Sequence, residues 1–264
     1  MDVRDMTAVI LAGGKGTRIS EESVLRPKPL VAIGGKPILW HIMKIYASFG
    51  VHKFIICCGY KGEAIKKYFL NFNLENGDTE FWLNKEGIQT NTEPEDDWDV
   101  ILVNTGLNTK TAGRILKIKN YIDSDDEFFL TYGDGVADID LNKLLDFHHR
   151  SGKTVTISTT QPEGRFGAIK ISDDGIVESF SEKARRNQSF VNIGFMIMTR
   201  KVWDYFGDGT EMLEKGPFEA LVRKKQMTAY RHLGFWSPMD NVNDRAYLES
   251  LWKNGAPWKI WEEN

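Results

Sequence analysis

Through the first 160 residues, short apolar runs alternate with stretches in which apolar side chains recur every three or four positions. The runs are rich in aliphatic and β-branched residues, as is typical of strands buried in a parallel sheet, and comprise residues 7–12, 52–58, 127–131 and 154–160. The periodic stretches predict helices over residues 38–49, 62–72 and 141–149. Strands that alternate with helices predict a doubly wound, mostly parallel, Rossmann-like α/β sheet flanked by helices.

Two regions depart from this alternation and predict a β-rich flank. Residues 79–83 and 100–103 are β-type runs on either side of the polar, acidic stretch 84–99. We interpret this region as a β excursion with a mobile loop, acting as a lid or a subunit contact. After Pro162, strands are expected at residues 168–171, 177–181 and 190–198, and helices at residues 201–206, 218–224 and 242–252. The sequence has no internal repeat or linker, which predicts one domain over residues 1–264.

The composition limits the expected partners and compartment. The 34 lysines and arginines and 37 aspartates and glutamates give a net charge of −3, which argues against a nucleic acid or an anionic membrane as partner. No apolar run is long enough to cross a membrane, and the first residues lack the apolar core of a signal peptide. The two cysteines, Cys57 and Cys58, are adjacent in an apolar run, which predicts buried, reduced thiols. A cytoplasmic protein is therefore expected.

Candidate chemistry begins where the first expected strand ends. Residues 11–18 read LAGGKGTR, and ligands of an open parallel sheet bind beyond the carboxyl ends of its strands. The glycines allow main-chain N–H groups to approach an anion, while Lys15 and Arg18 add positive charge. The spacing fits neither a Walker P-loop nor the dinucleotide fingerprint, because Ile19 stands where the latter requires a small residue. By itself, the loop is also compatible with a tight structural turn.

The residues that follow make the pattern specific. The glycine loop is followed by Pro27-Lys28-Pro29 and then by GGKPIL at residues 34–39. Together these motifs resemble those of the sugar-1-phosphate nucleotidyltransferases. The resemblance spans nearly the whole chain and is strongest to the glucose-1-phosphate cytidylyltransferases of that family. It is carried by residues 37–46, 57–62, 131–135, 234–240 and 255–261.

The resemblance implies transfer of a cytidylyl group from CTP to a sugar 1-phosphate, giving a CDP-sugar and pyrophosphate, with Mg²⁺ as cofactor. It assigns catalysis to Arg18, Lys28 and Asp134. The implied nucleotide-binding residues are Leu11, Ala12, Gly13, Gly14, Gly16, Thr17, Arg18, Lys28, Arg114 and Asp134. Residues 1–160 would form the nucleotide half of the domain and residues 161–264 the acceptor half. The expected partners are CTP and the sugar 1-phosphate, without nucleic acid or membrane, and a homo-oligomer is expected.

Two carboxylates are the implied magnesium ligands. Asp134 lies between two glycines just after an expected strand, where its side chain can project into a cleft, and Asp240 belongs to a Pro-Met-Asp motif. A site made only of oxygen ligands that keeps several waters suits Mg²⁺. On the acceptor side, the resemblance implies contacts from Glu182, Lys183, Asn192 and Gly194.

The acceptor half departs from the family pattern at several positions. Ile193 replaces a glycine, Gly216 replaces a carboxylate and Asn243 replaces an arginine. A branched side chain in place of a hydrogen atom fills volume that a tightly held hexose would need. We therefore expect an acceptor other than glucose 1-phosphate.

Three alternatives stay open. The residues do not decide between CTP and UTP or dTTP as the nucleotide. Residues 138–140 match the D-x-D pattern of glycosyltransferases that consume nucleotide sugars, although we interpret Asp140 as the N-cap of the helix that begins at Leu141. A regulatory relative that only binds a nucleotide sugar would keep the fold and lose the charged site residues, which this chain retains.

Overall fold

An open, mixed sheet forms the centre of the protein. The computed structural model describes residues 2–14, 26–72, 79–82, 87–90, 96–122, 127–161, 168–171, 177–181 and 189–262. Neighbouring strands follow the order β13–β10–β14–β8–β1–β4–β7, and β15 pairs with β10 as well. Their bounds are β1 Thr7–Leu11, β4 Lys53–Cys58, β7 Asp99–Asn104, β8 Glu127–Tyr132, β10 Val155–Thr160, β13 Val191–Asn192, β14 Met196–Thr199 and β15 Met227–Arg231.

The strand directions divide this sheet into two parts. Strands β8, β1, β4 and β7 are parallel to one another, whereas β14 is antiparallel to both β8 and β10. The parallel part comes from the first half of the chain, in which strands alternate with helices. The prediction of a doubly wound, mostly parallel sheet with a β-rich flank is confirmed.

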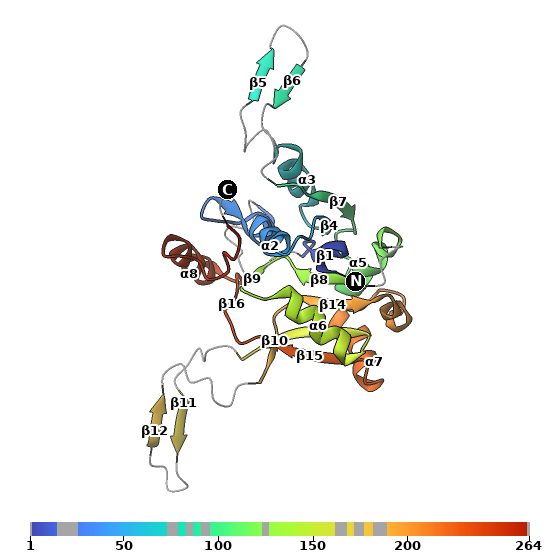
Figure 1. Ribbon diagram of the computed structural model, residues 1–264, viewed down its shortest axis with the longest axis vertical. Helices are drawn as coiled ribbons and strands as arrows, with labels where there is room; N and C mark the ends of the chain where they lie inside the picture. Colours follow the sequence, from blue (N-terminus) through green and yellow to red (C-terminus); the bar gives the residue numbers. More distant parts are fainter. Residues whose placement is uncertain are drawn as a thin grey trace.

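Helices cover both faces of the sheet. They are α2 Ile38–Ala47, α3 Gly62–Leu70, α5 Thr111–Lys117, α6 Leu141–Ser151, α7 Pro217–Arg223 and α8 Val242–Lys253. Alternate residues of β1 belong to different apolar clusters, with Ile10 packed beside α2 and α8 and Val9 packed beside α5 and α7. Figure 1 shows α2 and α8 on one side of the central strands and α5 and α7 on the other.

Local chemistry determines where several helices begin and end. The Asp140 carboxylate accepts a hydrogen bond from the Lys143 N–H, and α6 ends at Gly152 in the left-handed region with φ 60°. The interpretation of Asp140 as an N-cap is therefore confirmed. Helix α8 begins with a capping box, in which Asn241 and Asp244 each accept from the other's backbone.

Two details of the predicted β flank were wrong. Strand β7 is no excursion, because it extends the parallel sheet by pairing with β4 along its whole length. The run at 190–198 is no single strand, because Gly194 and Phe195 have positive φ values of 80° and 43° and separate β13 from β14. These two short strands pair with successive parts of β10.

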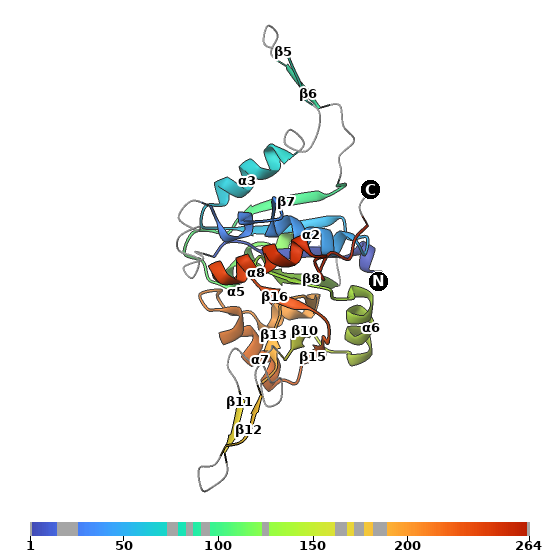
Figure 2. The same cartoon turned by 90° about the vertical axis from the view of Figure 1, so that its left-hand side faces the viewer.

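Two β-ribbons lie at opposite ends of the long axis of the molecule (Figures 1 and 2). One pairs β5 Thr79–Trp82 with β6 Gly87–Thr90, and β6 falls inside the stretch predicted to be a loop. The other pairs β11 Ala168–Ile171 with β12 Val177–Ser181, as predicted. No helix of the described residues is long and apolar enough to span a membrane.

The remaining elements are short. Two small antiparallel sheets pair β2 Ala32–Ile33 with β3 Lys36–Pro37, and β9 Gly135–Ala137 with β16 Trp236–Pro238. The 3₁₀ turns are η1 Val3–Asp5, η2 Lys28–Leu30, η3 Lys119–Tyr121, η4 Arg200–Tyr205 and η5 Leu213–Lys215. Cys57 and Cys58 are buried free thiols, as expected.

Candidate active site

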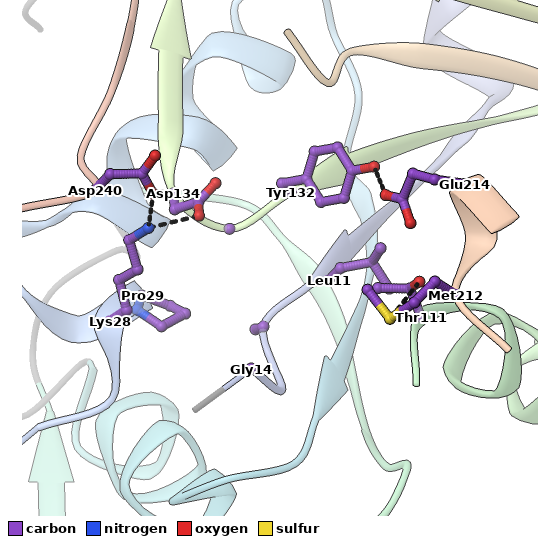
Figure 3. Close-up of a pocket in the computed structure, with 12 residues that line it drawn as sticks. Leu11, Gly14, Lys28, Pro29, Thr111, Tyr132, Asp134, Met212, Glu214 and Asp240 are labelled. Carbon is purple, nitrogen blue, oxygen red and sulfur yellow. Dashed lines mark hydrogen bonds and ion pairs between the residues drawn. The ribbon is translucent and has the colours of Figure 1, made fainter. Parts of the chain in front are cut away.

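A cavity of about 570 Å³ opens beyond the carboxyl ends of β1 and β8. The backbone from Leu11 to Gly14 forms part of its wall, while Lys28 and Asp134 line another part, together with Asp240 from the C-terminal half of the chain (Figure 3). The cavity is placed where an open parallel sheet is expected to bind its ligand.

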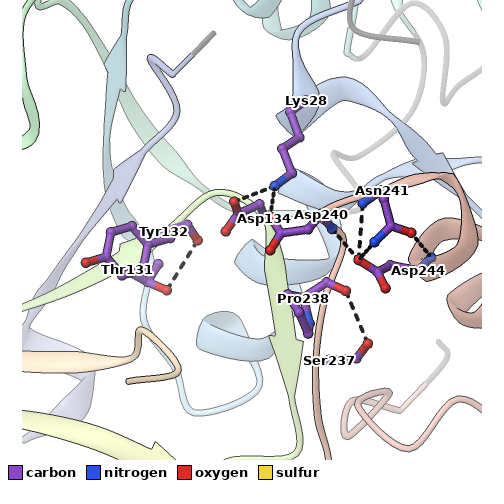
Figure 4. Close-up of polar contacts among 9 residues, drawn as sticks. All are labelled: Lys28, Thr131, Tyr132, Asp134, Ser237, Pro238, Asp240, Asn241 and Asp244. Atoms are coloured by element: carbon purple, nitrogen blue, oxygen red, sulfur yellow. Dashed lines mark hydrogen bonds and ion pairs between the residues drawn. The ribbon is translucent and has the colours of Figure 1, made fainter. Parts of the chain in front are cut away.

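Lys28 occupies the space between the two predicted metal ligands. Its Nζ atom lies 2.7 Å from Asp134 Oδ2 and 2.7 Å from Asp240 Oδ1 (Figure 4). Burial lowers the pKa of Lys28, but the two carboxylates outweigh it, so the pKa is raised and the ammonium keeps its charge. The space between the carboxylates therefore already accommodates a cation.

Pairing of β9 with β16 brings Asp134 and Asp240 together, although they are far apart in the sequence. Gly135 is opposite Pro238 in this strand pair, and the Met239 N–H donates to the Asp134 carbonyl at 2.8 Å. The Asp244 carboxylate accepts from the backbone N–H of Asp240 at 2.8 Å, so the helix cap also fixes the backbone of the second carboxylate (Figure 4).

Arg114 lies beneath the glycine loop with only 5% of its surface exposed. Its guanidinium donates to the carbonyl oxygens of Gly13 and Gly106, each at 2.9 Å. Burial lowers its pKa. The phosphate contact expected of Arg114 stays a prediction. Gly16, Thr17 and Arg18 lie outside the described residues.

Two hydrogen bonds that the sequence did not reveal join the halves of the chain across the cavity. The Tyr132 hydroxyl donates to Glu214 at 2.6 Å, and the Leu213 N–H donates to Thr111 Oγ1 at 2.7 Å. Burial and the Glu214 carboxylate both raise the pKa of Tyr132, which keeps its hydroxyl protonated. The position of Tyr132 at a strand end was a usable signal, whereas no sequence pattern singles out Glu214.

A second cavity, of about 260 Å³, also borders the carboxylate pair. Asn192, Ile193 and Trp236 line it together with Asp134 and Asp240. Ile193 is 4% exposed and limits the volume of this cavity, while the buried Trp236 Nε1 has no hydrogen-bond partner among the described residues. The Gly194 N–H donates to Asn192 Oδ1 at 3.1 Å. Glu182 and Lys183 lie outside the described residues.

Comparisons with known proteins agree with the fold and with the family resemblance. The family model described as nucleotidyl transferase matches residues 7–246. A glucose-1-phosphate cytidylyltransferase of Salmonella typhi is 46% identical over 97% of this chain and 100% of its own length. A probable glucose-1-phosphate cytidylyltransferase of Bacillus subtilis is 42% identical over the same shares.

A solved structure shares the fold at much lower identity. HddC from Yersinia pseudotuberculosis superposes with a TM-score of 0.64 at 23% identity, covering 94% of this chain and 99% of its own. This likeness concerns the fold alone. The family match and the full-length relatives confirm the resemblance drawn from the glycine loop, the Pro-Lys-Pro segment and the Pro-Met-Asp motif. The chain belongs to the sugar-1-phosphate nucleotidyltransferase family.

Proposed function

We propose that this enzyme transfers the cytidylyl group of CTP to a sugar 1-phosphate, producing a CDP-sugar and pyrophosphate. The observation that carries the proposal is the Lys28–Asp134–Asp240 cluster. All three residues line a cavity beside the glycine loop, and the two carboxylates also line a smaller cavity beside Asn192 and Ile193. This arrangement fits two phosphorylated substrates whose phosphates meet at the cluster. The cytidylyltransferase relatives support CTP as the nucleotide.

The chemistry needs positioning and charge neutralisation more than proton transfer. A phosphate oxygen of the sugar 1-phosphate attacks the α-phosphorus of CTP. The bond between the α-phosphorus and the oxygen that bridges it to the β-phosphorus breaks. Pyrophosphate leaves with the bonding electron pair. Because the acceptor phosphate is already a nucleophile, no general base is assigned.

The chain's own residues divide this work. We assign Lys28 and Arg18 to the triphosphate charge, with Asp134 beside the reacting phosphates. The glycine loop, from Leu11 and Ala12 through Gly13, Gly14, Gly16 and Thr17, would hold the nucleotide. Lys183 would hold the acceptor phosphate, while Glu182, Asn192 and Gly194 would contact the sugar.

The two carboxylates suit Mg²⁺. Asp134 and Asp240 present only oxygen atoms, and their shared space already holds the Lys28 ammonium. Mg²⁺ in proteins commonly takes one or two carboxylates and completes its coordination with water and substrate phosphates. When bound between these carboxylates, Mg²⁺ would supply further charge neutralisation to the phosphates.

The cellular setting and the assembly are also part of the proposal. The buried free thiols Cys57 and Cys58 support a reducing compartment, and we propose the cytoplasm. We further propose a homo-oligomer, because an isolated two-stranded ribbon is at best marginally stable in water and this chain has one at each end.

The proposal is tested by a pyrophosphate-release assay with CTP, UTP and dTTP against a panel of sugar 1-phosphates. We expect release with CTP and formation of a CDP-sugar, identified by mass spectrometry. Release that is faster with UTP or dTTP would change the nucleotide. Release of a nucleoside diphosphate from a nucleotide sugar, without pyrophosphate, would replace the reaction class with glycosyl transfer.

A further inference from the structure

We infer that Arg114 is a positioning residue that aims the main-chain N–H of Gly14 at the nucleotide, and that its guanidinium acts through the glycine loop rather than on the phosphates. The inference deepens the proposed function and rests on it, because the ligand of that N–H is taken to be CTP. It gives Arg114 a role different from the phosphate contact implied by the family resemblance.

The guanidinium joins the carboxyl ends of three neighbouring parallel strands. Nη2 donates to the Gly13 carbonyl, two residues after β1, at 2.9 Å. Nη1 donates to the Gly106 carbonyl, two residues after β7, at 2.9 Å, and lies 3.4 Å from the carbonyl of Cys58, the last residue of β4. Nη1 also donates to Thr105 Oγ1. Both terminal nitrogens of the guanidinium therefore donate to oxygen atoms of the protein.

The Gly13 carbonyl is the acceptor that matters for the nucleotide. It accepts from the Tyr60 N–H at 3.1 Å as well as from Arg114, so both of its lone pairs are used. In a trans peptide the carbonyl and the next N–H point in opposite directions, and the described residues contain no cis peptide. Fixing the Gly13 carbonyl toward the protein therefore turns the Gly14 N–H away from it.

The space around Gly14 is open to a ligand. Gly14 lines the 570 Å³ cavity, and a Cβ atom built on it would meet nothing within 4 Å. At Gly13 and Gly59, by contrast, a Cβ atom would overlap the Arg114 guanidinium. Glycine at these two positions makes room for the guanidinium, while Gly14 leaves room for the nucleotide.

A phosphate contact made by the two terminal nitrogens would undo this arrangement. To turn Nη1 and Nη2 toward a phosphate, the guanidinium would have to leave the Gly13 and Gly106 carbonyls, and acceptors left without a donor are costly. It would also release the peptide that presents the Gly14 N–H. The geometry therefore favours an indirect role.

The test measures binding of CMP, CDP and CTP by calorimetry to the wild type and to Arg114→Met and Arg114→Lys. A positioning role predicts that both variants lose about tenfold affinity for all three ligands, because the loop holds the CMP part that they share. Arg114→Lys is not expected to restore the affinity, since one ammonium cannot reproduce the planar, multi-donor guanidinium. Lys28→Met is the reference for a phosphate contact, and its loss should grow from CMP to CTP.

Gly13→Ala provides an independent test in which residue 114 is still arginine. Its methyl group displaces the guanidinium from the carbonyl, so we expect a similar loss, and the double variant Gly13→Ala/Arg114→Met should bind no more weakly than Arg114→Met. Amide hydrogen exchange at Tyr60, measured without nucleotide, should become faster in Arg114→Met while the melting temperature still shows a folded protein.

The outcomes separate this inference from the proposed function. A loss for Arg114→Met that grows with the number of phosphates, rescue by lysine, additive effects in the double variant or unchanged exchange at Tyr60 would each overturn the inference. Wild-type protein that fails to bind CTP would refute the proposed function, whereas the hydrogen-exchange result would still report on the loop.

Discussion

Lys28 lies between two carboxylates that the chain brings together from different elements, one after β8 and one after β16. With 11% of its side chain exposed, it is held more firmly than a surface lysine. Removing any member of this cluster changes the charge at the centre of the site, so the three residues are expected to have distinct effects on turnover and binding.

Asp134→Asn is expected to reduce turnover at least a hundredfold and to preserve the fold, because it removes one anionic oxygen ligand from the metal site. The measurement is pyrophosphate release at saturating Mg²⁺. Asp140→Asn is the matched control, since asparagine caps a helix as well as aspartate does, and it should keep full activity. Turnover of Asp134→Asn close to wild type would contradict the metal assignment.

Lys28→Ala and Lys183→Ala should separate the two substrates. Lys28→Ala is expected to weaken binding of CTP alone, whereas Lys183→Ala should leave CTP binding nearly unchanged and raise the apparent KM for the sugar phosphate. Calorimetry with CTP and steady-state kinetics with the sugar phosphate measure the two effects. Equal losses of CTP affinity in both variants would contradict this division.

Ile193→Gly should raise kcat/KM for glucose 1-phosphate with CTP about tenfold or more, because Ile193 lines the 260 Å³ cavity and removal of its side chain would enlarge that cavity. Ile193→Val keeps most of that volume and serves as the control. Efficient turnover of glucose 1-phosphate by the wild type, unaffected by Ile193→Gly, would show that this position does not select the acceptor.

At the scale of elements, α2 is attached to the C-terminal segment through a buried histidine. The Trp258 indole donates to His41 Nδ1 at 3.4 Å, so Nε2 carries the proton and donates to the Ile33 carbonyl at 2.8 Å. Trp40 and Trp252 pack edge-on against the same ring. The neutral imidazole satisfies all of its hydrogen bonds here, while a second proton would face the Trp258 donor.

Stability should therefore fall in mild acid. Burial lowers the pKa of His41 to about 4, below its usual 6.5, so the unfolded chain takes up this proton first as the pH falls. The stabilisation that comes from burying neutral His41 is complete above pH 6.5. It is lost progressively down to pH 4, by a total of about 3 kcal/mol in the free energy of unfolding.

Urea unfolding between pH 7 and pH 4 measures this effect. His41→Gln should lose the part of the pH dependence that belongs to His41, whereas His52→Gln, at an exposed position, should keep it. The same slope in His41→Gln and the wild type would assign the acid sensitivity to other groups.

The helices and strands of the parallel half were predictable because, in each, the apolar pattern and the residues at its ends indicate the same structure. Helix α6, for instance, has an apolar stripe, an aspartate N-cap and a glycine at its end. The split between β13 and β14 was not predictable, because the apolar run continues through Ile193 and Phe195 and only the backbone angles reveal the break. Helix α5 was missed because its seven residues are too few for a clear period.

At the scale of the whole molecule, the two ribbons provide the best test of assembly. Analytical ultracentrifugation of the full chain should show an oligomer, and replacing residues 79–90 with a short glycine–serine linker should shift the mass toward the monomer. The melting temperature of the shortened chain controls for folding. A monomeric wild type, or an oligomer that keeps its size without either ribbon, would rule out this role for the ribbons.

The site was predictable as far as strand ends and motifs determine it. Gly14 and Asp134 line the same cavity as Lys28 and Asp240, because the ends of the parallel strands β1 and β8 meet at one edge of the sheet. Glu214 could not be foreseen, because its contact with Tyr132 joins residues 82 positions apart and depends on how the two halves pack.

The contact between Lys28 and Asp240 spans 212 positions, so the charged cluster also reports the order in which the chain becomes competent. Contacts between residues distant in sequence form slowly, because the chain loses the entropy of closing a long loop before the contact contributes any favourable free energy. During synthesis, strands β1, β4, β7 and β8 emerge well before Asp240 and can pair with one another. A nascent or truncated chain would thus have the sheet and the glycine loop but only one carboxylate beside Lys28, and catalytic competence would appear at the end of synthesis.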